Sequence, residues 1–395
     1  MSPERHALRL KHIASITVSN VDKKSAEGQR AVRLCNYTDV YYNAAITSAL
    51  AFMEATASES QINQFTIQPG DVLITKDSET PDDIAVPAYV EESLGDLLCG
   101  YHLAVIRPNT SSVYPKFLYW TLASSAVRSR FGSEATGVTR FGLRTDSIAN
   151  APILLPSRET QQRIADFLDR ETARIDSLIE KKRLMIELLD ERFLAFTKHV
   201  VLAGLDPVTG SAELPDSWQQ CRLGTAITLH RGFDLPETER REGSVPVISS
   251  GARAGSHDTA TCAPPGVVTG RYGTIGAVHF IDQPFWPLNT TLFVSDFRGN
   301  DAKWVYYLLR VLPLDIDAEK SAVTGINRNV VGALHVPLPP VEAQVELART
   351  LDNHAGHHAR LTAALSAQID RLVEHRQALV AAAVTGDLFL EEAAV

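Results

Sequence analysis

Residues 155–204 read LPSRETQQRIADFLDRETARIDSLIEKKRLMIELLDERFLAFTKHVVLAG, and residues 338–386 read LPPVEAQVELARTLDNHAGHHARLTAALSAQIDRLVEHRQALVAAAVTG. The two stretches align without a gap at a constant offset of 183 residues, which places Gln161 on Gln344. A repeat of this length indicates that one structural module occurs twice in the chain. The fold is therefore expected to consist of two related halves, each ending in one of these stretches.

Both stretches predict long amphipathic helices. Apolar side chains recur at spacings of three and four, and a proline opens each stretch while a glycine closes it. At about 1.5 Å per residue, such a helix spans roughly 60–70 Å and cannot bury its apolar stripe in one small domain. We therefore expect the two helices to pack against each other. The expected packing residues are Leu168, Ile175, Leu178 and Leu189 in the first helix and Leu351, Leu361, Leu372 and Leu379 in the second.

Two positions of the apolar stripe are polar in one copy only. Lys182 stands where the second copy has Leu365, and His358 stands where the first copy has Ile175. One interpretation places the Lys182 ammonium group in solvent and His358 at an exposed edge of the stripe. The other is that both residues fix the register and orientation of the pair, as a buried polar residue can in a coiled coil. Gly356 lies close to His358, so we expect helix continuity to be weakest there.

The composition is that of an ordinary globular chain. At 395 residues with 45% hydrophobic content, two or three domains with normal cores are expected. No apolar run reaches membrane-spanning length, and the first residues do not resemble a signal peptide, which favours a cytoplasmic protein. The cysteines are far apart in the sequence and predict neither a disulfide framework nor a zinc site; they are Cys35, Cys99, Cys221 and Cys262.

The formal net charge of −9 argues against a free-standing nucleic-acid-binding protein. When the chain is divided into its modules and long helices, no segment carries a net positive charge. Any binding to DNA must therefore use local basic clusters, or a partner must supply much of the charge that neutralises the phosphates.

The segments that precede the two long helices are also related. Lys116–Trp120 resembles Lys303–Tyr307 at an offset of 187, and Arg9-Leu10 corresponds to Arg222-Leu223 at an offset of 213. Because the offset falls from 213 to 183 along the module, the first copy carries 30 more residues than the second. Most of this excess is expected in the acidic stretch 77–96.

Each module is predicted to have an α/β fold. In the first module, strands are expected at 72–75 and 103–106 and a helix at 117–127. The Gly- and Pro-containing stretch 204–216 predicts the linker between the two halves. In the second module, strands are expected at 245–248, 266–269, 277–281 and 291–294 and a helix at 303–312.

Motifs of a self-contained enzyme are missing from the sequence. No GxGxxG opens a helix after a strand, no GxxxxGK[ST] loop occurs, and the Asn/Asp-Pro-Pro-aromatic tetrapeptide of amino-methyltransferases is absent. His354, His357 and His358 have a helical spacing that could present metal ligands, but no further ligand follows at a convincing spacing. We therefore predict no catalytic site and no metal site, and interpret the histidines as a solvated helix face.

Side chains of the kinds that read base edges gather in both modules. Arg, Lys, Asn and Gln exchange hydrogen bonds with bases, and Thr or an aromatic ring can contact a thymine methyl group. Each residue alone is most simply an ordinary surface or turn residue, but the sets recur just before both long helices. The candidate DNA-binding residues are Lys116, Arg128, Arg130, Thr139, Arg140 and Arg144 in the first module and Arg253, Arg271, Tyr272, Asn289, Asn327 and Arg328 in the second.

Several short motifs are typical of one protein family. They are GVTRFGLR at 137–144, IDSLIEKK at 175–182, LPDSW at 214–218 and AVTG at 383–386. With the order module, helix, module, helix, they make the chain resemble the specificity (S) subunit of type I restriction–modification enzymes. The resemblance covers essentially the whole chain, although the first module lacks the Leu-Pro-x-x-Trp opening.

The resemblance implies two α/β target-recognition domains that alternate with two long helices packed as an antiparallel coiled coil. It further implies a non-catalytic subunit that reads a bipartite, asymmetric DNA target and docks two methyltransferase (M) subunits, with restriction (R) subunits joining where they are encoded. S-adenosylmethionine and ATP then belong to these partners, so this chain is expected to hold no cofactor. The expected bounds are 1–154 and 207–337 for the recognition domains and 155–206 and 338–395 for the helical spacers.

The helix pair is then expected to hold two unlike DNA readers at a fixed separation, since accessible faces of B-DNA recur about every 34–36 Å. Two other classes of protein are weighed against this one. The first is an enzyme with unrecognised motifs, which binding of S-adenosylmethionine to the isolated chain would reveal. The second is a coiled-coil scaffold that binds protein without DNA recognition, which a gel shift with pooled random duplexes would separate.

Overall fold

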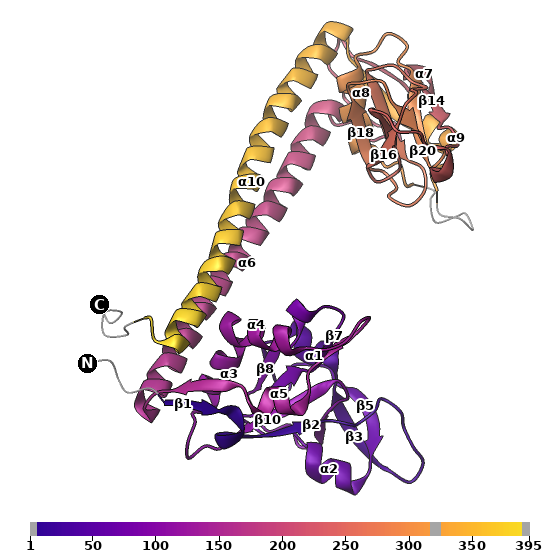
Figure 1. Ribbon diagram of the computed structural model, residues 1–395. Helices are drawn as coiled ribbons and strands as arrows, with labels where there is room; N and C mark the ends of the chain where they lie inside the picture. Colours follow the sequence, from indigo (N-terminus) through magenta and orange to yellow (C-terminus); the bar gives the residue numbers. More distant parts are fainter. Residues whose placement is uncertain (1–5, 317–324, 389–395) are drawn as a thin grey trace. The chain divides into compact units, whose positions relative to one another are not determined.

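The structure of the chain is a computed structural model (Figure 1). It describes residues 6–316 and 325–388. Within these ranges, none of the helices combines the length and the apolar composition needed to cross a membrane.

The chain divides into two compact units, and each contains one α/β domain together with part of both long helices. The long helices are α6 (Arg158–Leu202) and α10 (Val341–Thr385), of 45 residues each. Helix α10 runs through Gly356 without interruption. The order of domain, helix, domain, helix confirms the predicted fold class. The first unit comprises Met1–Lys181 and Ala367–Val395, and the second comprises Lys182–Ser366.

The first α/β domain is built on a five-stranded sheet in the order β2-β10-β6-β8-β4. Its central strands, β6 (Val72–Thr75) and β10 (Leu103–Pro108), pair antiparallel. Alternate side chains of a strand face opposite sides, so Val72 joins a hydrophobic cluster with helix α3 while Leu73 joins another with α1. The other elements are β1 (His6–Arg9), β2 (Ala14–Val18), β3 (Arg30–Cys35), α1 (Tyr37–Tyr42), β4 (Ala45–Ile46), β5 (Met53–Ala57), α2 (Glu59–Phe65), β7 (Asp77–Ser78), β8 (Pro87–Val90), β9 (Leu97–Cys99), α3 (Pro115–Ala123), α4 (Ser125–Glu134), β11 (Phe141–Gly142), α5 (Thr145–Ala149) and β12 (Pro152–Leu155).

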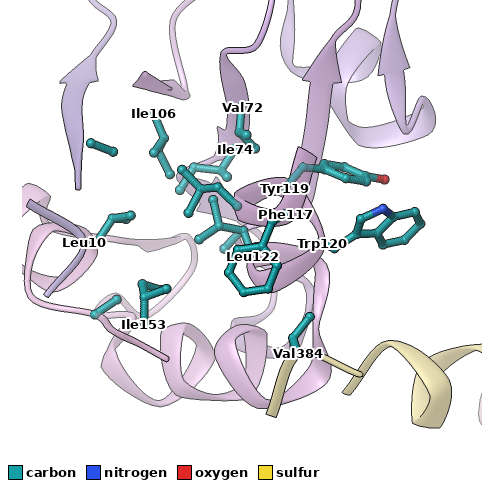
Figure 2. Packing of buried hydrophobic residues seen from close by; sticks show 14 of the residues in the cluster. Leu10, Val72, Ile74, Ile106, Phe117, Tyr119, Trp120, Leu122, Ile153 and Val384 are labelled. Atoms are coloured by element: carbon teal, nitrogen blue, oxygen red, sulfur yellow. The ribbon is translucent and has the colours of Figure 1, made fainter. Parts of the chain in front are cut away.

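The ends of both long helices complete the core of the first domain. Figure 2 shows Phe117 of α3 among the strand side chains, with Val384 of α10 in the same cluster. Leu168, near the start of α6, also belongs to this cluster and is fully buried. Trp120 donates its Nε1–H to Asp169 of α6 at 2.7 Å. The start of α6 therefore meets the end of α10 in the first unit.

The second α/β domain repeats this plan with the sheet order β14-β20-β17-β18. Trp304 and Tyr307 of α8 cover one face of the sheet in a cluster that also contains Leu202 of α6 and Leu351 of α10. The end of α6 thus meets the start of α10 here, so the two helices are antiparallel. The elements are β13 (Gln219–Arg222), α7 (Leu223–Ala226), β14 (Thr228–Arg231), β15 (Val245–Ile248), β16 (Arg253–His257), β17 (Gly266–Gly270), β18 (Val278–Ile281), β19 (Trp286–Pro287), β20 (Thr291–Asp296), α8 (Ala302–Val311), α9 (Arg328–Gly332) and β21 (His335–Leu338).

Most predicted elements are present, but the single helix expected at 117–127 is wrong. The chain forms α3 and α4 there, and the break falls at Ser124, whose backbone is extended (φ −66°, ψ 144°). The Ser124 hydroxyl donates to the Thr121 carbonyl at 2.7 Å and so stabilises the break. A serine hydroxyl competes with the helical hydrogen-bond pattern in this way.

The extra residues of the first module lie mainly before β6, not in the stretch 77–96 as predicted. Strand registers make Ile16 equivalent to Leu229, an offset of 213, and Thr75 equivalent to Gly270, an offset of 195. Most of the 30 additional residues therefore lie between β2 and β6. Strands β3 and β5 of this segment form a smaller sheet with β9, in the order β5-β3-β9.

Side chains along each long helix that are at least half-buried recur with alternating spacings of three and four. This average of 3.5 residues is the repeat of a left-handed coiled coil. On α6 the series is Leu168, Thr172, Ile175, Ile179, Lys182, Ile186, Leu189 and Phe193, and on α10 it is Leu351, Ala355, His358, Thr362, Leu365, Ile369, Leu372, Arg376 and Leu379.

Two of the expected packing residues are outside this series. Leu178 is 40% exposed and Leu361 is 39% exposed, whereas Ile179 is only 5% exposed. After Ile175, a step of three or of four reaches an apolar residue, so helical spacing alone does not choose between Leu178 and Ile179. The repeat offset then carried the same error to Leu361.

The two polar interruptions can be followed at His358, which lies within the helix contact and not at an exposed edge. Its ring stacks on Phe193 of α6 with centroids 4.9 Å apart, and its Nε2 lies 2.9 Å from Asp190 Oδ1. The ring of His354 packs against Phe196 at 4.3 Å. These contacts favour the register-fixing interpretation of His358 over the solvated-face interpretation.

The corrected helix contact gives a matched test with two adjacent residues. Ile179→Ala should lower the free energy of unfolding by roughly 2–5 kcal/mol, because it removes a buried side chain. Leu178→Ala should change it by about 0.5 kcal/mol, because this side chain faces solvent. Chemical denaturation of the full chain followed by circular dichroism measures both. Equal losses would show that the coiled-coil repeat is assigned wrongly.

Candidate nucleic-acid interface

In the first domain, three segments far apart in the sequence meet at the end of β6. The Lys76 amide donates to the His102 carbonyl at 2.9 Å, and the Leu143 amide donates to the Lys76 carbonyl at 2.8 Å. Lys76 is thereby fixed between the turn that precedes β10 and the segment that precedes α5. Gly142 leaves room for Asp77 here, because a Cβ at this position would lie 2.9 Å from Asp77 Oδ1.

The second domain has the same backbone arrangement at the end of β17. The Arg271 amide donates to the Thr290 carbonyl at 2.9 Å, and the Ile326 amide donates to the Arg271 carbonyl at 2.9 Å. Gly325 is required for a related reason, because a Cβ there would lie 2.4 Å from the Tyr272 ring. The two domains thus share one backbone frame at the same place in the fold, where β6 or β17 ends. We call this place the strand-end site.

This shared frame relates residues of the two domains, and of these pairs the sequence comparison aligned only Arg144 with Asn327, at the offset of 183. Each pair occupies the same position along the backbone but differs in side-chain chemistry. The pairs are Lys76 with Arg271, Asp77 with Tyr272, Tyr101 with Asn289, His102 with Thr290, and Arg144 with Asn327.

In the first domain, the strand-end site contains a largely buried cluster of charged and polar side chains. Asp77 Oδ2 lies 2.7 Å from Lys76 Nζ and 2.5 Å from His102 Nδ1. A carboxylate that is 13% exposed needs such partners to offset its loss of hydration. The Tyr101 ring, which is 49% exposed, packs against His102 with centroids 4.1 Å apart. Cationic, imidazole and aromatic groups therefore meet at one surface.

In the second domain, the corresponding groups are arginine, tyrosine and asparagine. The Arg271 guanidinium stacks over the Tyr272 ring at 4.5 Å. The Asn289 amide donates to Asp234, whose carboxylate also lies 3.8 Å from Arg231. The structure therefore brings together Arg271, Tyr272 and Asn289, three of the residues predicted from sequence.

Thr139 and Arg140 lie exposed in the turn that leads into β11. Gly137 has a φ of 156°, and a Cβ there would lie 1.9 Å from the Arg140 carbonyl oxygen, so this tight turn needs glycine. Strand β11 pairs with β7, where Phe141 faces Ser78. The turn is therefore attached to the edge of the strand-end site.

Two predicted arginines of α4 are paired with acidic residues. Arg130 Nη2 lies 2.7 Å from Glu134, and Arg128 Nη2 lies 3.9 Å from Asp83. Asp83 also accepts a hydrogen bond from the Tyr41 hydroxyl, which raises the pKa of Tyr41 to about 12. The charges of both arginines are thus partly compensated within the protein.

The predicted residue Lys116 lies at the junction of α3 with α6 instead. Its ammonium group packs 4.2 Å from the Tyr89 ring and 3.3 Å from Glu91. Lys303, its counterpart in the repeat, packs 4.2 Å from the Phe280 ring in the second domain. These matching contacts indicate a role in packing.

The remaining predicted residues are spread over the second domain. Arg253 is exposed on β16, and Asn327 accepts a hydrogen bond from the Asn329 amide at 3.0 Å at the start of α9. Arg328 lines a hollow of about 450 Å³ together with Arg298, which sequence reasoning missed. Sequence reasoning also missed Lys76, Asp77, Tyr101 and His102, since the local sequence around them is acidic or apolar. An alignment of strand ends between the two modules could have found them.

Comparison with known proteins finds sequence similarity to one family. Residues 10–188 match the family model described as the type I restriction modification DNA specificity domain. A protein named as the MjaX type I restriction enzyme specificity subunit of Methanocaldococcus jannaschii is 23% identical over 329 residues, which are 76% of this chain and 75% of that protein. The HindI specificity subunit of Haemophilus influenzae is 27% identical over 149 residues, 37% of this chain and 31% of that protein. The chain is therefore similar to type I specificity subunits, and residues 10–188 match their DNA specificity domain.

Solved structures share the fold of this chain. A chain from a structural study of complex assembly and conformational transition in the type I restriction–modification system has a TM-score of 0.77 at 18% identity and covers 98% of this chain and all of that one. The HsdS subunit of Thermoanaerobacter tengcongensis has a TM-score of 0.55 at 19% identity, with 98% of each chain covered. The predicted resemblance to type I specificity subunits is confirmed by these relatives.

The charge pairing around α4 gives a matched test of the arginines. In a complex with a type I methyltransferase subunit, Arg140→Ala is expected to weaken DNA binding almost equally for all sequences. The slope of log K against log salt concentration should fall in magnitude by about one, as expected for a lost phosphate contact. Arg130→Ala should change neither quantity, because Glu134 already compensates that charge. Fluorescence anisotropy over a salt series measures both variants, and identical behaviour would remove Arg140 from the interface.

Proposed function

We propose that this specificity subunit reads a bipartite, asymmetric DNA target, with one half-site for each α/β domain. The observation that carries the proposal is the strand-end site, which occurs once in each domain with the same backbone and different side chains. The same backbone frame supports docking of both domains on DNA in the same way, and the different side chains support recognition of different sequences. The proposed partner is therefore double-stranded DNA with two different short half-sites separated by a spacer.

The proposal also assigns phosphate neutralisation largely to partner subunits. The net charge of −9 opposes tight binding of this chain alone to DNA. We therefore propose that methyltransferase subunits, two per chain, complete the DNA-binding surface and perform the chemistry, and that restriction subunits join where they are encoded.

An apolar face of α6 supports docking of a methyltransferase subunit. Three large side chains that share one side of this helix, on the second unit's portion, are at least half exposed: Leu184 (54%), Met185 (51%) and Leu188 (54%). They lie outside the positions that contact α10. Exposed apolar side chains that gather in this way mark protein interaction surfaces. We propose that a helix of the methyltransferase subunit packs on this face.

The test of the proposed function is to map methylation in cells that express this chain with the cognate methyltransferase subunit. Long-read sequencing should find one motif composed of two unlike half-sites and a fixed spacer. The isolated chain should bind pooled duplexes weakly and without preference in a gel shift, and the complex should bind the mapped motif. A complex that forms but methylates no defined motif would instead favour the scaffold function.

The docking face gives its own prediction. Leu188→Glu should weaken association with the methyltransferase subunit at least tenfold, because a charge would be buried at the contact. Val208→Glu is the matched control, since Val208 is 56% exposed but lies beyond the end of α6. Analytical ultracentrifugation of the mixtures measures both. Unchanged association of the Leu188 variant would place the docking site elsewhere.

The antiparallel helices predict how the spacer is set. The contacts of Asp176 with Arg376 and of Asp190 with His358 place residues near 183 and 367 at one level of the pair. One heptad inserted after Arg183 and another after Ser366 should preserve the 3.5-residue repeat and lengthen the pair by about 10 Å. The mapped motif should keep both half-sites and gain about three base pairs of spacer. A heptad in α6 alone is the control, and it should disrupt packing and abolish methylation.

A further inference from the structure

We propose that Lys76 and His102 in the first domain, and Arg271 and Asn289 in the second, contact base edges and determine the sequence of one half-site each. This inference rests on the proposed function, and it assigns specificity to named residues. The observation behind it is that the cationic donors Lys76 and Arg271 stand at matching positions of the two strand-end sites. A second polar group, His102 or Asn289, lies on the segment that is bonded to each donor or next to it.

The backbone holds these side chains more firmly than a surface loop would. Lys76 is bonded through both its amide and its carbonyl to segments on either side, and Arg271 is bonded in the same way. Residues that read bases must be held close to the productive geometry by their surroundings. The exposed turn residue Arg140 is not held in this way, and its charge suits phosphate contact.

In the first domain, Asp77 acts as the positioning residue for both readers. Its carboxylate lies 2.7 Å from the Lys76 ammonium and 2.5 Å from His102 Nδ1. The His102 backbone has a φ of 73°, a left-handed conformation that costs energy for a residue other than glycine. This conformation is held by two contacts: the His102 carbonyl accepts a hydrogen bond from the Lys76 amide, and the His102 ring contacts Asp77. Such strain persists where the surroundings enforce it, often at functional sites.

The chemistry of the two sites follows from these contacts. Lysine and arginine donate to the O6 and N7 acceptors of guanine in the major groove. The His102 tautomer that carries its proton on Nδ1 donates it to Asp77 and leaves Nε2 as an acceptor, which suits the amino group of adenine or cytosine. In the second domain, the Asn289 amide N–H donates to Asp234, so its carbonyl oxygen is the group left to accept. Each site therefore combines a donor for guanine with an acceptor for an amino group.

The competing explanation is that Lys76, Asp77 and His102 form an ion cluster that only stabilises the domain. A stability role and a reading role make different predictions, because loss of stability lowers methylation of every site without changing the motif. The deciding measurement is therefore the motif itself, and not the activity.

The experiment uses the full chain in complex with the cognate methyltransferase subunit and maps methylated motifs by long-read sequencing. Lys76→Ala should relax one position of one half-site, with discrimination reduced by about ten- to a hundredfold, and leave the other half-site and the spacer intact. Arg271→Ala should relax one position of the other half-site. Lys76→Gln should shift the preferred base at the same position from guanine toward adenine, since glutamine pairs with adenine. Arg130→Ala is the control and should keep the wild-type motif.

A second pair of variants covers the case in which Lys76→Ala fails to fold. Lys76→Arg keeps the charge beside Asp77 and should retain guanine at its position. Arg271→Lys loses the fork geometry and should weaken discrimination at one position of the second half-site. If the wild-type complex yields no bipartite motif, the proposed function is wrong. If the wild-type motif is bipartite but the Lys76 and Arg271 variants keep it unchanged, the base-contact assignment is overturned while the proposed function stands.

Discussion

Each α/β domain closes its core with the ends of both long helices, and the rest of the structure depends on this shared burial. Leu168 of α6 and Val384 of α10 belong to the core of the first domain, and Leu202 and Leu351 belong to that of the second. Apolar burial contributes about 25 cal/mol for each Å² removed from water. The hydrophobic effect that stabilises each domain therefore also holds the helix ends in its core. The helices are therefore structural parts of both domains, which explains why a compact unit contains pieces from distant parts of the chain.

A buried glutamine makes each of these joints specific. Gln161 accepts a hydrogen bond from the Tyr114 amide at 2.7 Å and donates to the Pro156 carbonyl at 2.9 Å. Gln344 accepts from the Asp301 amide and donates to the Pro339 carbonyl, both at 2.9 Å. Both side chains are 1% exposed, and a buried amide left without partners is costly. A domain that rotated about its helix would break these bonds, so the joint holds each domain at one angle to the helix that follows it.

The sequence predicted the parts of the fold that repeat along the chain, and it failed where contacts are non-local. The long helices followed from periodicity, but Leu178 and Ile179 are both apolar and only the partner helix distinguishes them. At the site, Arg271, Tyr272 and Asn289 could be proposed because basic and polar residues of the second module gather near turns. Lys76 and Asp77 could not, because their role depends on hydrogen bonds to His102 and Leu143, which are far away in the sequence. Lys116 was proposed from its charge, although its aromatic neighbours were not visible before folding.

The two strand-end sites show how the side chains of a site can differ while the fold is kept. The hydrogen bonds that build the frame join backbone groups, so they do not depend on which side chains the frame carries. The side chains are nevertheless coupled to one another. Asp77 is largely buried and needs polar partners, so Lys76, Asp77 and His102 form a set in which one member cannot be exchanged alone without a cost. The second domain has Tyr272 in place of that acid, and its Arg271 stacks on a ring instead of pairing with a carboxylate. A change of target is therefore expected to replace such a set as a whole, with Gly142 or Gly325 retained because each leaves room for the side chain beside it.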